Sequence, residues 1–348
     1  MNLLERIGMP LVKRLDPEVG HDVTIRALNA GLAPRRGPFS TPRLAQTLAG
    51  LSLPNPVGLA AGFDKNAQAM APLLKAGFGF IEVGATTPKP QPGNPKPRLF
   101  RLSEDLAAIN RFGFNNDGME VIAERLAART DHGIVGLNLG ANKVSANRTI
   151  DYITVLETCG PHVDFATINV SSPNTERLRE LQGKDQLYGL VKGAQETRDS
   201  FNKRIPIFLK VAPDIDERLI EDISEVARMT RIDALICTNT TIARPGLQSE
   251  HGIQKGGLSG RPLFDISNAV QVEFAQRLQG SVPIIGVGGV SSAQDAYRKI
   301  RLGASAVQLY TALVFNGFSL VNKIAKGLDR LLDADGFNHV SEAVGVDL

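Results

Sequence analysis

Eight short apolar runs constrain the fold of this chain more than any other feature of its sequence. The runs are rich in Val and Ile and apolar at successive positions, as expected for strands buried on both faces of a parallel sheet. They span residues 57–62, 80–84, 134–140, 165–171, 207–212, 234–240, 284–289 and 306–311. Most are separated by segments of helical periodicity, such as 216–230 and 292–303. This alternation favours an α/β fold, a closed (β/α)8 TIM barrel, over an open doubly wound sheet.

The region between the second and third runs does not follow this repeat. Residues 85–133 form a long excursion, and the segment 86–98 within it contains five prolines, which exclude a helix there. Loops of this length inside a domain commonly carry function. We therefore expect the excursion to contribute to a site.

The N-terminal segment also lies outside the repeat and predicts two short helices. The second helix begins at Asp16-Pro17, an N-cap followed by a first-turn proline, and ends at Gly31. In the first helix, apolar and basic residues follow helical spacing: Leu3, Leu4, Ile7, Leu11 and Leu15, flanked by Arg6, Lys13 and Arg14. From the segment alone, the apolar face either packs on the barrel or lies on an anionic bilayer. We assign residues 1–40 to a small helical domain and residues 41–348 to the barrel.

Composition excludes several classes of function. The chain has 348 residues, 43% of them hydrophobic, and its net charge of +3 includes no long run of like charges, so nucleic-acid binding is not expected. Cys159 and Cys237 have neither metal-ligand nor disulfide spacing, and Cys237 lies in an apolar run typical of a buried strand. No apolar stretch reaches the roughly 18 residues of a spanning helix, and no secretory signal is present. A cytoplasmic setting without a bound metal is expected.

Polar residues gather where the predicted strands end. An Asn or Lys in such a place is ordinary on its own, because these residues favour turns or solvent. A barrel, however, brings the carboxyl ends of all its strands to one mouth, where active sites lie. The residues concerned are Lys65, Asn138, Asn169, Ser172, Lys210, Thr238, Asn239 and Thr240. The five histidines lie outside these strand ends, which argues against hydrolysis by a serine nucleophile.

Two glycine-rich segments are candidates for holding a phosphate. The segment 284–292 ends a strand in glycines and starts a helix at Ser291 or Ser292, which would direct backbone N–H groups at an anion. The segment 256–262 offers a second glycine loop. The last two strands of a barrel frequently carry such a site. A dinucleotide fold is rejected, because its glycine motif follows the first strand.

Amide side chains indicate the kind of ligand. The segment 110–116, Asn174 and Asn239 present groups that both donate and accept hydrogen bonds, as a cyclic imide-like ring requires. Lys65 is a candidate to pair with a substrate carboxylate. Lys210 is a candidate to stabilise an anion that develops on a flavin.

The sequence as a whole resembles the class 2 dihydroorotate dehydrogenases, which are membrane-associated and quinone-dependent. The motifs that carry the resemblance, in order, are "GLAAGFDKN", "IEVGATTPKPQPGNPKPRLFRL", "INRFGFNN", "INVSSPNT", "LKVAPD", "TNTT", "GGLSGRP", "PIIGVGGV" and "VQLYTALV". The resemblance implies oxidation of dihydroorotate to orotate in pyrimidine biosynthesis, with FMN as hydride acceptor and a quinone as the final acceptor. It makes Ser172 the base that removes the C5 proton. Class 1 relatives carry cysteine there.

The resemblance also implies roles for individual residues. FMN would contact Ala61, Gly62, Phe63, Asp64, Lys65, Ala85, Asn138, Asn169, Lys210, Thr238, Gly260, Gly289, Tyr310 and Thr311. Orotate would contact Lys65, Asn110, Arg111, Phe112, Gly113, Phe114, Asn169, Asn174, Asn239 and Thr240. The quinone side would include His21, Arg101 and Tyr310. The chain departs from the family pattern at Ala85, usually Thr or Ser, and at Glu176-Arg177, usually Pro-Gly in the active-site lid.

The same resemblance changes the interpretation of the N-terminal segment. It implies a helical pair that docks on the membrane and forms a quinone tunnel, in a monomer held peripherally at the cytoplasmic face of the inner membrane. Two alternatives stay open at this stage. One is a soluble relative that uses fumarate or NAD. The other is a non-catalytic barrel that binds a phosphate-bearing ligand.

Overall fold

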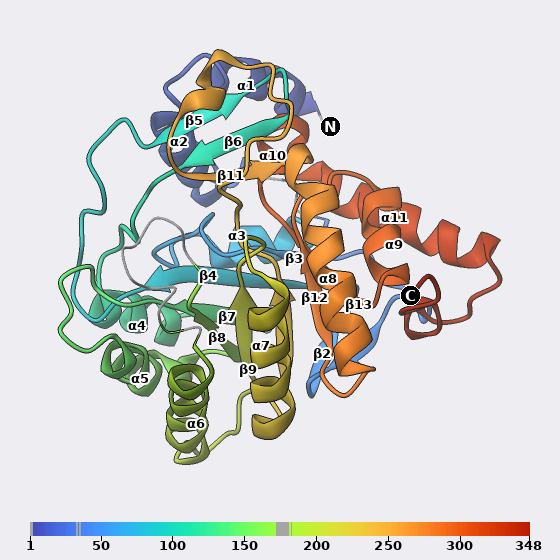
Figure 1. Ribbon diagram of the computed structural model, residues 1–348. Helices are drawn as coiled ribbons and strands as arrows, with labels where there is room; N and C mark the ends of the chain where they lie inside the picture. Colours follow the sequence, from blue (N-terminus) through green and yellow to red (C-terminus); the bar gives the residue numbers. More distant parts are fainter. Residues whose placement is uncertain (1–2, 33, 35, 172–180, 182) are drawn as a thin grey trace.

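A closed barrel of eight parallel strands forms the centre of the molecule (Figure 1). The computed structural model describes residues 3–32, 34, 36–171, 181 and 183–348. The barrel strands are β3 (Val57–Leu59), β4 (Phe80–Thr86), β7 (Ile134–Leu139), β8 (Phe165–Asn169), β9 (Ile207–Val211), β10 (Ala234–Cys237), β12 (Ile284–Val287) and β13 (Ala304–Leu309). They pair in the order β10-β12-β13-β3-β4-β7-β8-β9, and β9 closes on β10. The predicted barrel is confirmed, although β3 ends before residue 60 and β13 begins before residue 306.

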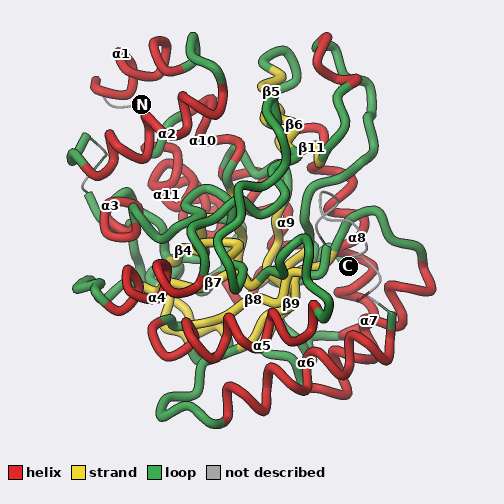
Figure 2. The backbone as a smooth tube through the Cα atoms, turned by 90° about the vertical axis from the view of Figure 1, so that its left-hand side faces the viewer, coloured by secondary structure: helices red, strands yellow, loops and turns green. Residues whose placement is uncertain are grey.

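Helices cover the outer face of the barrel, which Figure 2 shows as strands enclosed by helices. They are α3 (Met70–Lys75), α4 (Met119–Ala127), α5 (Arg148–Cys159), α6 (Lys184–Asp199), α7 (Glu217–Thr230), α8 (Phe264–Leu278), α9 (Ala293–Arg301) and α11 (Ser319–Ala334). The short helix α10 (Thr311–Asn316) lies at the barrel mouth instead, beside β11. Helix α7 illustrates the origin of the helices that cover the barrel. Asp216 caps it by accepting from Leu219 N at 2.8 Å, while Ile223 and Val226 turn to the barrel and are buried.

Apolar side chains fill the lower half of the barrel interior. Phe80, Phe165 and Phe208 point inward, and the last two rings stack with centroids 4.8 Å apart. Glycine is required at positions 58 and 136, because a Cβ at 58 would lie 2.4 Å from the Phe80 ring and a Cβ at 136 would lie 2.1 Å from the Phe165 ring. An antiparallel hairpin, β1 (Gln46–Leu48) and β2 (Leu51–Leu53), packs against the same cluster. Since this end is filled, a ligand enters at the carboxyl ends of the strands.

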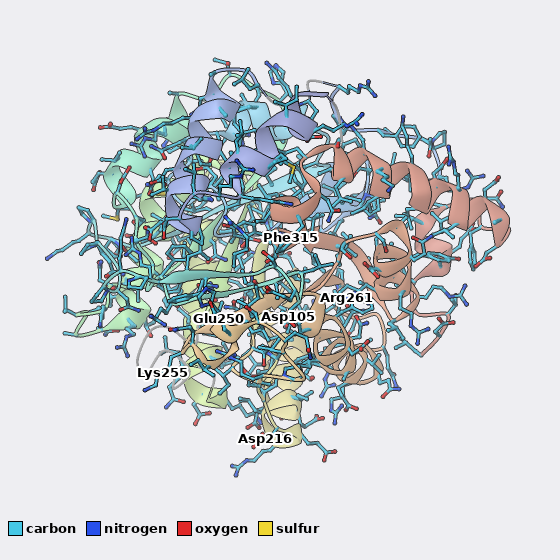
Figure 3. All side chains as sticks on the ribbon, turned by 90° about the horizontal axis from the view of Figure 1, so that it is seen from above. Asp105, Asp216, Glu250, Lys255, Arg261 and Phe315 are labelled. Carbon is cyan, nitrogen blue, oxygen red and sulfur yellow. The ribbon has the colours of Figure 1, made fainter. Side chains whose placement is uncertain are left out.

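The excursion builds a second, antiparallel sheet above the barrel mouth, in the order β11-β6-β5. Its strands are β5 (Leu99–Leu102), β6 (Ala107–Asn110) and β11 (Gly257–Gly260). The segment 256–262, interpreted above as a loop, therefore supplies a strand instead. Its glycines permit a close approach, since a Cβ at Gly256 would lie 2.3 Å from the Asn110 carbonyl oxygen. Asp105, labelled in Figure 3, fixes the segment that precedes β11 by accepting from Gln248 N and Ser249 N.

The two predicted N-terminal helices are present as α1 (Leu3–Val12) and α2 (Pro17–Asn29). Asp16 caps α2 by accepting from Glu18 N and Val19 N at 3.0 and 3.2 Å. The buried carboxylate of Glu5 accepts from Ser319 N at 2.9 Å and from Ser319 Oγ at 2.6 Å, which fixes α1 to the start of α11. Among the helices of the described residues, none is both long and apolar enough to cross a bilayer.

Candidate active site

One cavity of about 720 Å³ opens at the carboxyl ends of the barrel strands and continues between α1 and α2. Its inner wall comes from the strand ends and from the β5–β6–β11 sheet. Its outer wall includes Met9, Gly20 and Thr24 from the two helices. The predicted site residues that line it are Ala61, Gly62, Phe63, Lys65, Ala85, Asn110, Phe112, Gly113, Phe114, Asn138, Asn169, Lys210, Thr238, Asn239, Thr240, Gly260, Gly289, Tyr310 and Thr311, with His21 and Arg101.

Two described candidates do not line the cavity. Asp64 is buried behind it, where its carboxylate accepts from Gln68 N and Ala69 N at 2.8 and 2.7 Å and so shapes the loop that carries Lys65. Arg111 turns outward, donates to the carbonyls of Lys255 and Pro97, and lies over the Phe100 ring. The predicted base Ser172, Asn174 and the departure at Glu176-Arg177 lie outside the described residues.

Two lysines give the mouth a positive potential. The ammonium of Lys210 is buried and has no hydrogen-bond partner within the described part of the chain. Burial lowers its pKa, an effect that the nearby Glu82 carboxylate opposes. Lys65 Nζ lies 4.3 Å from the centroid of the Phe112 ring, and burial lowers its pKa to about 8. Cations in this state favour an anionic ligand, because such a ligand would restore their charged form.

Amide side chains connect the barrel interior to the mouth. Asn138 Nδ2 donates to Glu82 at 2.6 Å, and Asn169 Nδ2 donates to Asn138 Oδ1 at 2.8 Å. Asn239 Nδ2 reaches Asn169 Oδ1 at 3.3 Å. Gln308 Nε2 donates to the other Glu82 oxygen at 2.7 Å. These groups pair with one another, so the amides of the mouth are held in fixed orientations.

The glycine loop after β12 is shaped for close backbone approach. Gly288 and Gly289 adopt φ of +116° and +73°, and a Cβ at Gly289 would lie 2.5 Å from Phe264 Cβ. Helix α9 follows, capped by Ser292, which accepts from Asp295 N at 3.1 Å. Helix α9 therefore begins next to Ser291 and Ser292, where the sequence predicted the helix that follows the phosphate loop. The loop lies on the cavity wall.

An aromatic cluster lines the cavity where the mouth continues into the space between α1 and α2. His21 meets Phe63 edge-on at a centroid distance of 5.2 Å, and its Nδ1 lies 3.5 Å from the Tyr310 hydroxyl. Burial, together with the charge of Lys65, lowers the pKa of His21 to about 3, so its imidazole is neutral at physiological pH. Arg101 donates to the Lys13 carbonyl at 2.7 Å on the same wall, and Lys13 Nζ donates to the carbonyl of Phe315, labelled in Figure 3.

Comparison with known proteins identifies the family. A family model described as dihydroorotate dehydrogenase matches residues 43–332. The chain belongs to the dihydroorotate dehydrogenase family. It is 57% identical over 346 residues to a dihydroorotate dehydrogenase (quinone) from Cereibacter sphaeroides, a match covering 99% of this chain and 98% of the relative. It is 47% identical over 351 residues to the mitochondrial dihydroorotate dehydrogenase (quinone) of Mus musculus, with 97% and 89% covered.

A solved structure agrees with this assignment. The crystal structure of ligand-free DHODH from Eimeria tenella matches with a TM-score of 0.92 at 40% identity, and covers 95% of this chain and 99% of that one. The resemblance expected from the motifs is therefore confirmed. The barrel fold expected for the chain is also confirmed.

As a dihydroorotate dehydrogenase, the chain contains residues that fit a flavin nucleotide. The buried ammonium of Lys210, without a hydrogen-bond partner among the described residues, suits an electron-rich ring, and the glycine backbone at 288 and 289 suits a phosphate. Thr311 Oγ1, on the same wall, donates to Ser259 Oγ at 2.8 Å. Ala85 lines the cavity without a hydroxyl, so only its backbone offers hydrogen bonds there.

Several residues that shape this dihydroorotate dehydrogenase site were missed from the sequence. Glu82 and Gln308 lie inside apolar runs, and the available signal was a single polar side chain at an inward-facing position of each run. Asn116, expected among the ligand amides, bonds to protein instead. It donates to Thr87 Oγ1 and to the Phe114 carbonyl, both at 2.8 Å, which fixes the segment 110–114.

Proposed function

We propose that this chain oxidises dihydroorotate to orotate with bound FMN and transfers the electrons to a membrane quinone. The observation that carries the proposal is one continuous cavity, which joins a mouth containing Lys65 and Lys210 to a space between two surface helices. The curated relatives named above carry the same activity in their names. Both half-reactions need access to one flavin, and a cavity with an inner and an outer part provides it.

The residues of the mouth have separate tasks in this proposal. Lys65 pairs with the substrate carboxylate, while Asn169 and Asn239 match the donors and acceptors of the ring. Ser172 removes the C5 proton, and Lys210 stabilises negative charge at the flavin. Bound FMN supplies the hydride acceptor. A serine hydroxyl is a weak base in water, so exclusion of water around it is part of its role.

The outer part of the cavity is proposed to admit the quinone. His21, Arg101 and Tyr310 line it, and the neutral imidazole of His21 can accept or donate a hydrogen bond to a quinone oxygen. Residues 1–40 act as the membrane-docking unit, and the chain is peripheral at the cytoplasmic face of the membrane. The chain is proposed to act as a monomer.

Anaerobic bleaching tests the proposed activity. The purified protein is expected to be yellow, and dihydroorotate added without oxygen should bleach its flavin absorbance within seconds. Ubiquinone should restore the colour, whereas fumarate or NAD should not. Protein that binds flavin but does not bleach would be a phosphate-ligand-binding barrel, and restoration by fumarate or NAD would indicate the soluble alternative.

The pH dependence of orotate binding tests the role of Lys65. Its pKa of about 8 in the free protein means that the ammonium is present below pH 8 and is lost above it. Binding of a carboxylate requires the ammonium, so the orotate dissociation constant should be flat below pH 8 and rise about tenfold per pH unit above it. Calorimetric titration between pH 6 and pH 10 measures this. Lys65→Met should bind weakly with a flat profile, and a flat profile in the unmodified protein would refute the role.

A further inference from the structure

Glu82 has no role in the proposed function, although it lies at the centre of the barrel. Its carboxylate is fully buried on β4, one inward position above Phe80 of the apolar floor. Asn138 Nδ2 donates to one oxygen at 2.6 Å and Gln308 Nε2 to the other at 2.7 Å. Burying a carboxylate is costly even when it is hydrogen-bonded. An apolar side chain would fill the same space at lower cost, so the carboxylate calls for an explanation.

A chain of hydrogen bonds runs from this carboxylate to the mouth of the cavity. Asn138 Oδ1 accepts from Asn169 Nδ2 at 2.8 Å. Asn169 Oδ1 in turn accepts from Ser171 Oγ at 3.0 Å and from Asn239 Nδ2 at 3.3 Å. Asn239 Nδ2 also donates to Ser171 Oγ at 3.0 Å. This series of hydrogen bonds therefore starts on three strands inside the barrel and ends at Ser171 and Asn239, of which Asn239 lines the cavity.

Glu82, the first residue in this series of hydrogen bonds, sets the direction in which each bond is donated. An ionised carboxylate only accepts hydrogen bonds, whereas a carboxamide has one donating and one accepting end. Asn138 must therefore turn its nitrogen to Glu82 and its oxygen to Asn169, and Asn169 must turn its oxygen to Asn239. Without an obligate acceptor at the start, each amide could rotate by half a turn. A reversed amide would present an acceptor where the cavity now presents a donor.

We infer that Glu82 is a positioning residue that fixes the orientation of the substrate-side amides, a role that rests on the proposed function because orotate is taken as their ligand. Glu82 itself lies behind Asn138 and does not line the cavity. A site with oriented polar groups discriminates strongly against a mismatched donor or acceptor, because the mismatch leaves buried groups unpaired. Loss of orientation should therefore weaken orotate binding more than it weakens the fold.

Two substitutions at Glu82 separate orientation from charge. Glu82→Gln removes the charge but keeps an oxygen for Asn138. Its nitrogen meets Gln308, whose Oε1 has no partner in the described structure and can turn to accept. Glu82→Met has similar length but offers no acceptor. By calorimetric titration of the flavin-containing protein, orotate should bind Glu82→Gln within about threefold of the unmodified protein, and Glu82→Met at least about tenfold more weakly.

A second pair of variants tests the direction of the chain without relying on the Met variant. Asn138→Asp places two acceptors face to face and should weaken orotate binding at least about tenfold. In the double variant Glu82→Gln/Asn138→Asp, the glutamine nitrogen donates to the new carboxylate, whose other oxygen still accepts from Asn169. The double variant should therefore bind orotate better than Asn138→Asp alone.

Flavin content and the midpoint of thermal unfolding are measured for every variant. Loss of flavin in parallel with loss of orotate affinity in Glu82→Met would assign Glu82 to general stability and overturn the inference. So would equal binding by the Gln and Met variants, or a double variant no better than Asn138→Asp. Failure of the unmodified protein to bind orotate or to bleach would refute the proposed function instead, so the two failures are distinguishable.

Discussion

Replacing Ser172 with alanine is expected to slow flavin reduction by dihydroorotate by about 10²- to 10⁴-fold while the protein retains its flavin. Removal of the C5 proton must keep pace with departure of the hydride, and alanine has no group that can accept it. The flavin contacts proposed above come from other residues, so cofactor content should not change. Anaerobic stopped-flow measurement of flavin absorbance after mixing with dihydroorotate reports this step alone.

Two control variants, one at residue 172 and one at residue 171, show whether the effect is specific to the hydroxyl of Ser172. Ser172→Cys restores a group that can take a proton, since a thiol ionises near pH 8.5, and should recover part of the rate. Ser171→Ala removes a hydroxyl that is already engaged with Asn169 and Asn239, and should slow the step by less than about tenfold. Flavin reduction at the unmodified speed in Ser172→Ala would exclude the serine as the base.

The strand pattern was readable from the sequence because a parallel barrel leaves a strong local signal. Each strand is buried on both faces, so every position in a run such as 284–289 is apolar or small, and the carboxyl ends must share one mouth. The two N-terminal helices were equally accessible. Asp16 and Pro17 form a capping pair whose effect is local and needs no tertiary contact.

Contacts between segments that are distant in sequence could not be predicted from local sequence patterns. Strand β11 forms because Gly256 and Gly260 allow the backbone of β6, about 150 residues earlier in the chain, to approach closely. Glycines in a strand of this kind cannot be told from glycines in a loop by the local sequence. Glu82 was overlooked because its partner Gln308 lies 226 residues away. Asn116 was assigned to the ligand because an amide that supports a loop and one that binds substrate look identical in sequence.

The exposed apolar face of the N-terminal helices leads to the second large expected effect. Ile7, Leu11 and Val19 are 61%, 59% and 48% exposed, so this face does not pack on the barrel. Of these, Leu11 and Val19 do not line the cavity. We expect Leu11→Glu/Val19→Glu to weaken binding to vesicles of phosphatidylglycerol and phosphatidylcholine about 100-fold. The reason is that two buried side chains contribute about 3 kcal/mol, and each 1.4 kcal/mol is a factor of about ten.

A matched double variant shows whether the effect belongs to this face. Ile150 on α5 and Met229 on α7 are 58% and 56% exposed and lie on helices that cover the barrel, so Ile150→Glu/Met229→Glu should leave vesicle binding unchanged. In the N-terminal variant, flavin reduction by dihydroorotate and turnover with a short, soluble quinone should both persist, because the cavity is intact. Turnover with a long-chain quinone in vesicles should fall with membrane binding. Unchanged vesicle binding would mean that this face does not dock on lipid, and parallel loss of all three activities would mean that it supports the fold.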